Sequence, residues 1–190
     1  METVLSICLG VGLSAACGFR VFVPLLVMSI ASLSGHLALA QGFQWIGTYP
    51  ALIAFSVATC LEVAGYYVPF VDHLLDLLAT PSAIVAGIII TASVITEISP
   101  LLKWALAIIA GGGAAGIVQG STVLVRGVST ATTAGFGNPI VATFELAGAV
   151  VTSILALTAP FAVAALLVAL LAVIAIKWLR RKRKSLSACA

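Results

Sequence analysis

The chain has 190 residues, of which 62% are hydrophobic and only 8% are charged, and its mean hydropathy is +1.26. A soluble domain carries roughly 25% charged residues, so this composition excludes a soluble protein and a large extramembrane catalytic domain. The net charge of +3 comes mainly from one basic run in residues 177–184, directly after an apolar stretch. That position is typical of the cytoplasmic end of a membrane span, and it argues against a nucleic-acid site.

Apolar stretches of membrane-crossing length recur along the sequence. A helix needs about 20 mainly apolar residues to cross the hydrocarbon. The short alternating segments of a membrane barrel are not seen. We therefore predict an all-α membrane protein with about six transmembrane helices. They form one domain over residues 1–180, followed by a basic tail over residues 181–190.

The first apolar stretch, residues 4–33, is longer than one span and is interrupted by Gly18, Arg20 and Pro24. Proline inside a helix removes a hydrogen bond and kinks the backbone, so we expect a broken first helix. The more polar residues 34–49 are expected to form a loop with a short interfacial piece.

The next spans are expected to begin at prolines, which are well tolerated at helix starts. The second covers residues 50–67. Residues 69–76 are too short to cross, and they predict an amphipathic half-helix before a third span over residues 81–96.

Residues 101–126 predict a fourth span, followed by a hydroxyl-rich loop over residues 129–138. Pro139 begins the fifth span, and residues 160–178 form the sixth. An even number of spans places both termini on one side, and the basic tail makes that side the cytoplasm.

The two halves of the chain, residues 1–97 and 98–180, resemble each other in pattern. Each has small residues at four-residue spacing, where another helix can approach closely. Three spans per half would invert the second copy, as in the 3+3 inverted repeats of secondary transporters. The small residues are Gly10, Ser14 and Gly18 in the first half and Gly112, Gly116 and Gly120 in the second.

Four charged residues fall within or at the ends of apolar stretches, where a charge costs at least about 2.5–3.5 kcal/mol. Two bases and two acids could neutralise one another, either as structural ion pairs or as gates of a transport path. Both interpretations stay open. The residues are Arg20, Glu62, Arg126 and Glu145.

Asp72, His73 and Asp76 form a D-H-x-x-D pattern. On a helix the two carboxylates share a face. Together with the imidazole they could bind a divalent metal or relay protons. A solvated helix start with acidic residues near the positive end of the helix dipole is the alternative.

The hydroxyl-rich stretch combines side-chain donors with a helix start. Asn138 is expected to cap the helix that begins at Pro139, and the free N–H groups there would suit an anion, with Arg126 nearby. The alternative is a loop that only caps a helix. The hydroxyl residues are Ser129, Thr130, Thr132 and Thr133.

These polar positions resemble the motifs of a bacterial membrane family, domain of unknown function 4126. The resemblance implies a small polytopic inner-membrane protein and no activity. It covers nearly the whole chain to about Glu145. The blocks that carry it are Gly18-Phe19-Arg20-x-Phe22-x-Pro24, Glu62, Pro69-x-x-Asp72-His73-x-x-Asp76-x-x-x-Thr80-Pro81, Arg126-x-x-Ser129-Thr130-x-Thr132-Thr133-x-Gly135-x-Gly137-Asn138-Pro139 and Glu145.

The leading functional hypothesis is a small transporter for an anion or a phosphate-bearing solute or lipid head group. Substrate would bind Arg20, Arg126 and the hydroxyl-rich stretch, while the acids and His73 would couple protons or gate the path. One alternative is a divalent cation carrier that uses Asp72, His73, Asp76 and Glu62. A non-transporting scaffold or assembly factor is another. We do not expect an enzyme, and a membrane-embedded enzyme is the remaining alternative.

Partners and cofactors follow from the same features. We expect the lipid bilayer, anionic lipid at the basic tail and a second copy of the chain as partners. The four cysteines match no zinc or redox spacing, and no cofactor is predicted.

Overall fold

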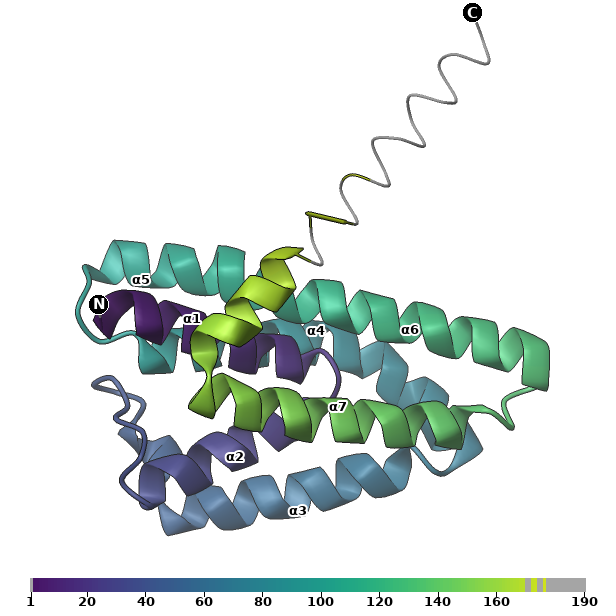
Figure 1. Ribbon diagram of the computed structural model, residues 1–190. Helices are drawn as coiled ribbons and strands as arrows, with labels where there is room; N and C mark the ends of the chain where they lie inside the picture. The colour runs from purple at the N-terminus through teal and green to yellow at the C-terminus, as the bar shows by residue number, and fades with distance from the viewer. Residues whose placement is uncertain (1, 170–171, 174–175, 177–190) are drawn as a thin grey trace, which may run out of the picture.

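The computed structural model describes residues 2–169, 172–173 and 176, apart from the side chains of Pro69, Phe70 and His73. Every regular element in these residues is helical, as the sequence predicted (Figure 1). The α-helices are α1 (Glu2–Cys17), α2 (Phe22–Leu33), α3 (Tyr49–Gly65), α4 (Pro69–Val94), α5 (Pro100–Leu106), α6 (Gly113–Thr133) and α7 (Asn138–Thr158), with a 3₁₀ turn η1 (Gln44–Gly47), a π-helical segment η2 (Ala107–Gly112) and a further helix at Pro160–Ala169.

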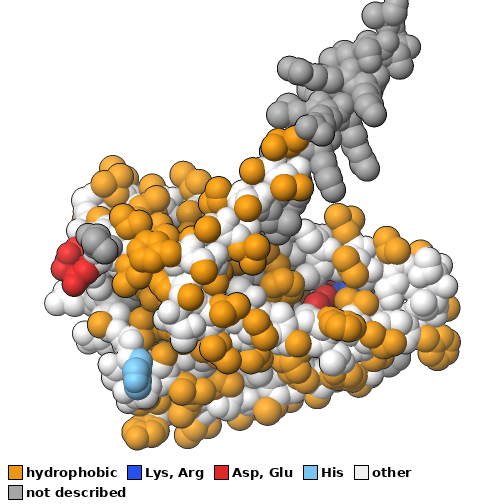
Figure 2. Space-filling model, in the orientation of Figure 1, with side chains coloured by type: hydrophobic (Ala, Val, Ile, Leu, Met, Phe, Trp, Pro, Cys, Tyr) orange, Lys and Arg blue, Asp and Glu red, His pale blue; other side chains and the backbone are white. Residues whose placement is uncertain are grey.

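Among the described residues, three helical segments are long and apolar enough to cross a membrane: Leu74–Val94, Pro100–Thr133 and Asn138–Thr158. The other apolar helices are shorter, so the expected six spans are not confirmed. Hydrophobic side chains cover most of the face seen in Figure 2, including the parts of α6 and α7 that face outward. The described residues are thus compatible with a membrane protein.

The first apolar stretch breaks, but it does not continue in one direction as a single bent span. Gly10 of α1 lies beside Thr91 and Val94, near the end of α4. Gly18 lies beside Val118 of α6, where a Cβ would come within 2.5 Å of the Cβ of Val118. From there α2 runs back, and α1 and α2 form an antiparallel hairpin (Figure 1).

The break comes before Pro24, which was expected to cause it. Residues 18–21 leave the helix, and α2 begins at Phe22 with Pro24 in its first turn. Proline there displaces no internal hydrogen bond, because the first N–H groups of a helix have no partner within the helix. The hairpin returns to the end of the bundle where it begins, so it removes one crossing from the predicted topology.

The predicted boundary at Pro81 was also wrong. Residues 69–94 form one continuous helix, with Pro69 in its first turn and Pro81 inside it. The half-helix predicted over residues 69–76 is therefore the first part of α4. Asp72 lies in the first turn of this helix, but its side chain is buried in the bundle instead of being solvated.

The hydroxyl-rich stretch is mostly helical, contrary to the loop that we predicted. Helix α6 continues past Arg126 to Thr133, and the turn that follows contains Ala134 and Gly135 at φ angles of 53° and 91°. Thr133 Oγ1 donates to the Ser129 carbonyl at 2.7 Å. Such bonds from hydroxyl side chains to the preceding turn let them remain in a helix.

The inverted repeat is not confirmed. The first half begins with the α1–α2 hairpin, whereas the second begins with a continuous helical run over residues 100–133. The small-residue stripes differ as well. Gly18 is in close contact with α6, but Gly120 faces open space.

The connections alternate between the two ends of the bundle. Residues 66–68 and 134–137 lie at one end, and residues 34–48 and 95–99 lie at the other (Figure 1). The N-terminal part of α1 lies at the second end. The end of the predicted sixth span and the basic tail lie outside the described residues.

Candidate functional site

Arg126 of α6 binds carboxylates from two other helices. Its Nε donates to both carboxylate oxygens of Glu145 in α7, at 2.9 and 3.1 Å, and its Nη2 also contacts Glu145. Its Nη1 donates to Asp72 of α4 and lies 3.4 Å from Asp76 Oδ1. Arg126 is only 3% exposed, so this is a buried ion-pair cluster.

Arg20, in the break between α1 and α2, joins the same cluster. Its Nη2 lies 3.5 Å from Glu145 Oε2 and donates to the Ala142 carbonyl at 2.9 Å. Its Nε and Nη1 are buried and have no hydrogen-bond partner among the described residues. The sequence left open whether Arg20 faces Glu62 or Glu145, and the structure places it against Glu145. The Glu145 carboxylate thus lies between two guanidinium groups.

Tyr66, directly after α3, contacts the same two arginines. The guanidinium carbons of Arg20 and Arg126 are 3.8 and 4.0 Å from the centre of its ring. Both guanidiniums therefore lie against the same ring. The ring attracts each cation through the negative charge of its faces.

Glu62 has a different role from the other acids. Its two carboxylate oxygens accept hydrogen bonds from the backbone N–H groups of Val21 and Phe22, at 2.8 and 3.1 Å. These N–H groups have no acceptor within α2, since they lie at its start. Glu62 therefore caps α2 from a neighbouring helix.

Asn138 does not cap α7, contrary to the prediction. Gly137 is the N-cap residue, and the Asn138 side chain turns inward, where its Nδ2 donates to Asp72 Oδ2 at 2.8 Å. It also contacts the hydroxyl of Thr130 at 3.1 Å. Asp72 is thus fixed from two sides, by Arg126 and by Asn138.

Only part of the predicted substrate site comes together. Arg20, Arg126, Thr130 and Asn138 do. The hydroxyls of Thr132 and Thr133 bond to carbonyls of their own helix. Ser129 Oγ lies near Gly137, where a Cβ would come within 2.6 Å, so it packs against the α6–α7 turn.

The predicted metal set does not form in the described part of the chain. Asp72 and Asp76 share a face, as expected, but both are directed to Arg126. Glu62 is bound to the start of α2. Among the described residues, no group of three or more His, Cys, Asp or Glu side chains is arranged so that it could hold a metal ion, and the His73 side chain lies outside the described residues.

Acids outnumber bases in this region. The guanidiniums of Arg20 and Arg126 face the carboxylates of Asp72, Asp76 and Glu145, and Glu62 lines the same hollow as Tyr66. Most of these side chains are buried. A full set of ionised carboxylates would leave an excess of negative charge away from water, which protonation of an acid removes.

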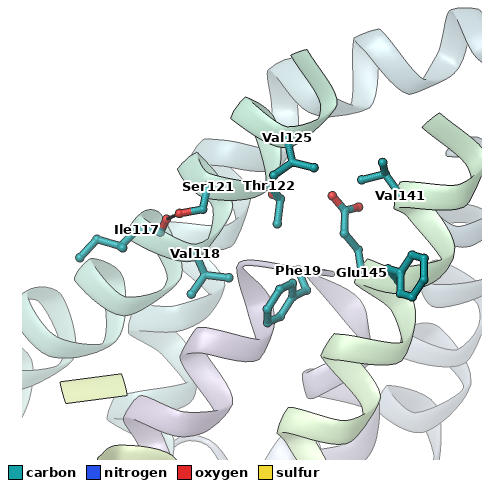
Figure 3. Close-up of a pocket in the computed structure, with 9 residues that line it drawn as sticks. Phe19, Ile117, Val118, Ser121, Thr122, Val125, Val141 and Glu145 are labelled. Atoms are coloured by element: carbon teal, nitrogen blue, oxygen red, sulfur yellow. Dashed lines mark hydrogen bonds between the residues drawn. The ribbon is translucent and has the colours of Figure 1, made fainter. Parts of the chain in front are cut away.

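Three hollows reach the cluster from different sides. One of about 300 Å³ is lined by Glu145 together with residues of α6 and α7 (Figure 3). A second, of about 390 Å³, is lined by Glu62 and Tyr66. A third, of about 430 Å³, is lined by Asp76, Arg126 and Thr130. The buried charges are therefore accessible through hollows that open between different helices.

Sequence reasoning missed Tyr66. It lies four residues after Glu62, at a spacing that puts two residues on one face of a helix. The spacing from a buried acid could have marked Tyr66 as a residue near the site. It could not have predicted that two arginines distant in the sequence contact the ring.

Residues 7–181 match the family described as a domain of unknown function (DUF4126), and the chain belongs to this family. The match confirms the family that the sequence motifs indicated. No curated protein and no solved structure matched the chain.

Proposed function

We propose that this protein is a small membrane transporter that moves an anion together with a proton. The observation that supports this best is the position of Glu145, whose carboxylate lies between Arg126, at 2.9 and 3.1 Å, and Arg20, at 3.5 Å. The carboxylate occupies the place that a bound anion would take.

Charge balance links the anion to a proton. While Glu145 is ionised, it neutralises the arginines, and a second anion there would be repelled. Protonation of Glu145 weakens its bonds to both guanidiniums and leaves them free for an incoming anion. One proton and one negative charge then enter together, and the net charge of the site is unchanged.

The other charged and titratable groups near Glu145 also bear on how anion binding depends on pH. Acids on α4 compete with it for Arg126, and both guanidiniums lie against the ring of Tyr66. Lower pH is therefore expected to favour anion binding, by up to about tenfold per pH unit for one linked proton. The groups are Arg20, Arg126, Asp72, Asp76, Glu62 and Tyr66.

A scaffold or assembly factor is the second candidate. It is favoured by the burial of Arg20 and Arg126, which are 1% and 3% exposed. Buried pairs of this kind can serve only to hold helices in register. In that case, changes to Glu145 would alter stability and would have no effect on flux.

We place the protein in a bacterial inner membrane, with the basic tail at the cytoplasmic face. The expectation that both termini lie there required six alternating spans, and the α1–α2 hairpin removes one of them. Binding of anionic lipid by the tail and formation of a homodimer remain predictions.

Proton uptake in proteoliposomes tests the proposal. Phosphate, lactate or chloride is added outside in turn, and a trapped pH dye reports the interior. We expect at least one anion to acidify the interior with the wild-type protein and not with Glu145→Gln. Glu97→Gln, an exposed acid between α4 and α5, is the matched control and should behave as wild type. No anion-driven acidification, or full activity of Glu145→Gln, would contradict the proposal.

A further inference from the structure

We infer that the anion is a carboxylate with an apolar chain and that it reaches the site from the bilayer, between α6 and α7. This inference rests on the proposed function, because it names the substrate of the same site. It follows from the shape of the hollow at Glu145, the chemistry at its base and the form in which an acid dissolves in lipid.

The hollow at Glu145 is apolar along its walls and acidic at its base. Figure 3 shows the Glu145 side chain directed toward α6, with Phe19 at one side. In Figure 2, acidic and basic atoms are visible in a hollow between α6 and α7, surrounded by hydrophobic side chains. The apolar lining residues are Phe19, Ile117, Val118, Val125, Val141 and Phe144.

The outer edge of the hollow faces the surroundings of the bundle. Phe144 and Val125 are 75% and 54% exposed, and both lie in segments apolar enough to span a membrane. A polar solute would gain nothing from these walls, whereas a hydrocarbon chain would fit against them. The occupant is therefore an amphiphile with its charged end inward.

The head group that the site takes is indicated by Glu145 itself. A carboxylate already bridges Arg20 and Arg126, so a ligand carboxylate can replace it with the same charge and geometry. Arg20 also has two buried nitrogen atoms, Nε and Nη1, without a partner among the described residues. When the ligand carboxylate and the Glu145 carboxyl group are both at the site, these two N–H donors can bind the oxygen atoms that the ligand adds.

The proton comes with the ligand. A carboxylic acid enters hydrocarbon in its neutral form, because an ion is costly there. At the site, the O–H bond of the acid breaks and an O–H bond forms on Glu145. The ligand, now a carboxylate, takes the place of Glu145 on the guanidiniums. The total charge of protein and ligand stays constant throughout.

The volume of about 300 Å³ lies at the lower end of the range for small-molecule sites, which favours a chain of medium length. Octanoate is a suitable probe and acetate its short counterpart. Each methylene that moves from water into the hollow should tighten binding by about fourfold. Octanoate should therefore bind far more tightly than acetate.

Binding is the appropriate measurement, since neutral octanoic acid crosses bilayers without a carrier. Radiolabelled octanoate is titrated onto the purified full-length protein, with empty micelles as background. Ser121→Phe reduces the space in the hollow without removing a charge, because Ser121 lines it and its hydroxyl donates to the Ile117 carbonyl of its own helix. Val128→Phe, at an exposed position of α6 away from the hollow, is the matched control.

We expect saturable octanoate binding that weakens at least about tenfold in Ser121→Phe and is unchanged in Val128→Phe, as removal of contacts with several methylenes requires. Binding to wild type should strengthen as the pH falls, whereas binding to Glu145→Gln should depend little on pH. An absence of saturable binding, or equal binding by the two phenylalanine variants, would overturn the inference.

Two further outcomes separate this inference from the proposed function. If octanoate does not bind but lactate or phosphate still drives Glu145-dependent proton uptake, the inference fails and the function stands. If octanoate does not bind and Ser121→Phe dissociates a dimer, a second copy of the chain occupies the crevice and the inference fails.

Discussion

Two regions of the bundle are packed in opposite ways. Where α1 crosses α4, Ser14 Oγ donates to the Gly87 carbonyl at 2.7 Å and lies 2.8 Å from the Thr91 hydroxyl. The contact is small, close and uncharged. Between α4, α6 and α7, by contrast, Arg126 and Glu145 fill the interior with large charged groups.

The difference in packing indicates which region can change its protonation and its contacts. The Ser14 contact has neutral donors and acceptors that bond to one another, and the helices approach closely there, since a Cβ at Gly87 would come within 2.8 Å of Ala115 Cβ. The Arg126–Glu145 cluster contains several acids that can gain or lose a proton, and hollows adjoin it. We therefore regard the small-residue contact as the fixed part of the bundle and the charge cluster as the variable part.

The largest effect is expected for Arg126→Ala. The change leaves Asp72, Asp76 and Glu145 without their shared cation, and loss of one partner from a buried pair costs about 3–5 kcal/mol. The thermal midpoint of unfolding in detergent measures it. Lys103→Ala, which removes a charge in α5, is the control. A midpoint equal to that of the control would show that the cluster contributes no stability.

A smaller loss is expected where the end of α1 packs closely against α6. A Cβ at Gly18 would come within 2.5 Å of Val118 Cβ and 2.7 Å of the Ala115 carbonyl oxygen, so Gly18→Ala must separate two backbones. Overpacking of this kind costs about 1–3 kcal/mol. At Gly120, on the same helix as Val118, nothing lies within 4 Å, so Gly120→Ala should leave unfolding unchanged or slightly favour the fold. Equal effects of the two changes would refute the close contact.

The smallest effect is expected for Glu62→Gln. The amide keeps one oxygen to accept from Val21 or Phe22 and presents an NH₂ group to the other, so one hydrogen bond is lost at about 1 kcal/mol. Hydrogen exchange measures this locally. Exchange at residues 21–22 should accelerate, while exchange in α7 should not change. Uniform acceleration would mean that Glu62 acts on the whole bundle instead of on the start of α2.

The sequence predicted which charged residues would be buried better than it predicted which of them would pair. Charges in apolar stretches are costly, so Arg20, Arg126 and Glu145 could be expected to pair. Arg20 nevertheless contacts a carbonyl 122 positions away, and no local pattern encodes that choice. Pairing at such distances is decided by how the helices pack.

The sequence also could not predict the direction that the chain takes after the break between α1 and α2. A long apolar stretch has the same composition whether its second part continues or turns back. Glu62 accepts hydrogen bonds from the N–H groups of Val21 and Phe22, 41 and 40 residues away, and these bonds let α2 start in the reverse direction. In the same way, Thr132 and Thr133 were expected in a loop, and bonds to their own helix keep them in α6.

The most direct test of the account is whether Glu145 becomes protonated when an anion binds. Infrared difference spectra of the reconstituted protein, recorded on adding lactate, phosphate or octanoate, would show the band of a protonated carboxyl group. We predict that this band appears with the wild-type protein for the anion that binds and is absent with Glu145→Gln. A wild-type spectrum without the band, although binding occurs, or an unchanged band in Glu145→Gln, would contradict the account.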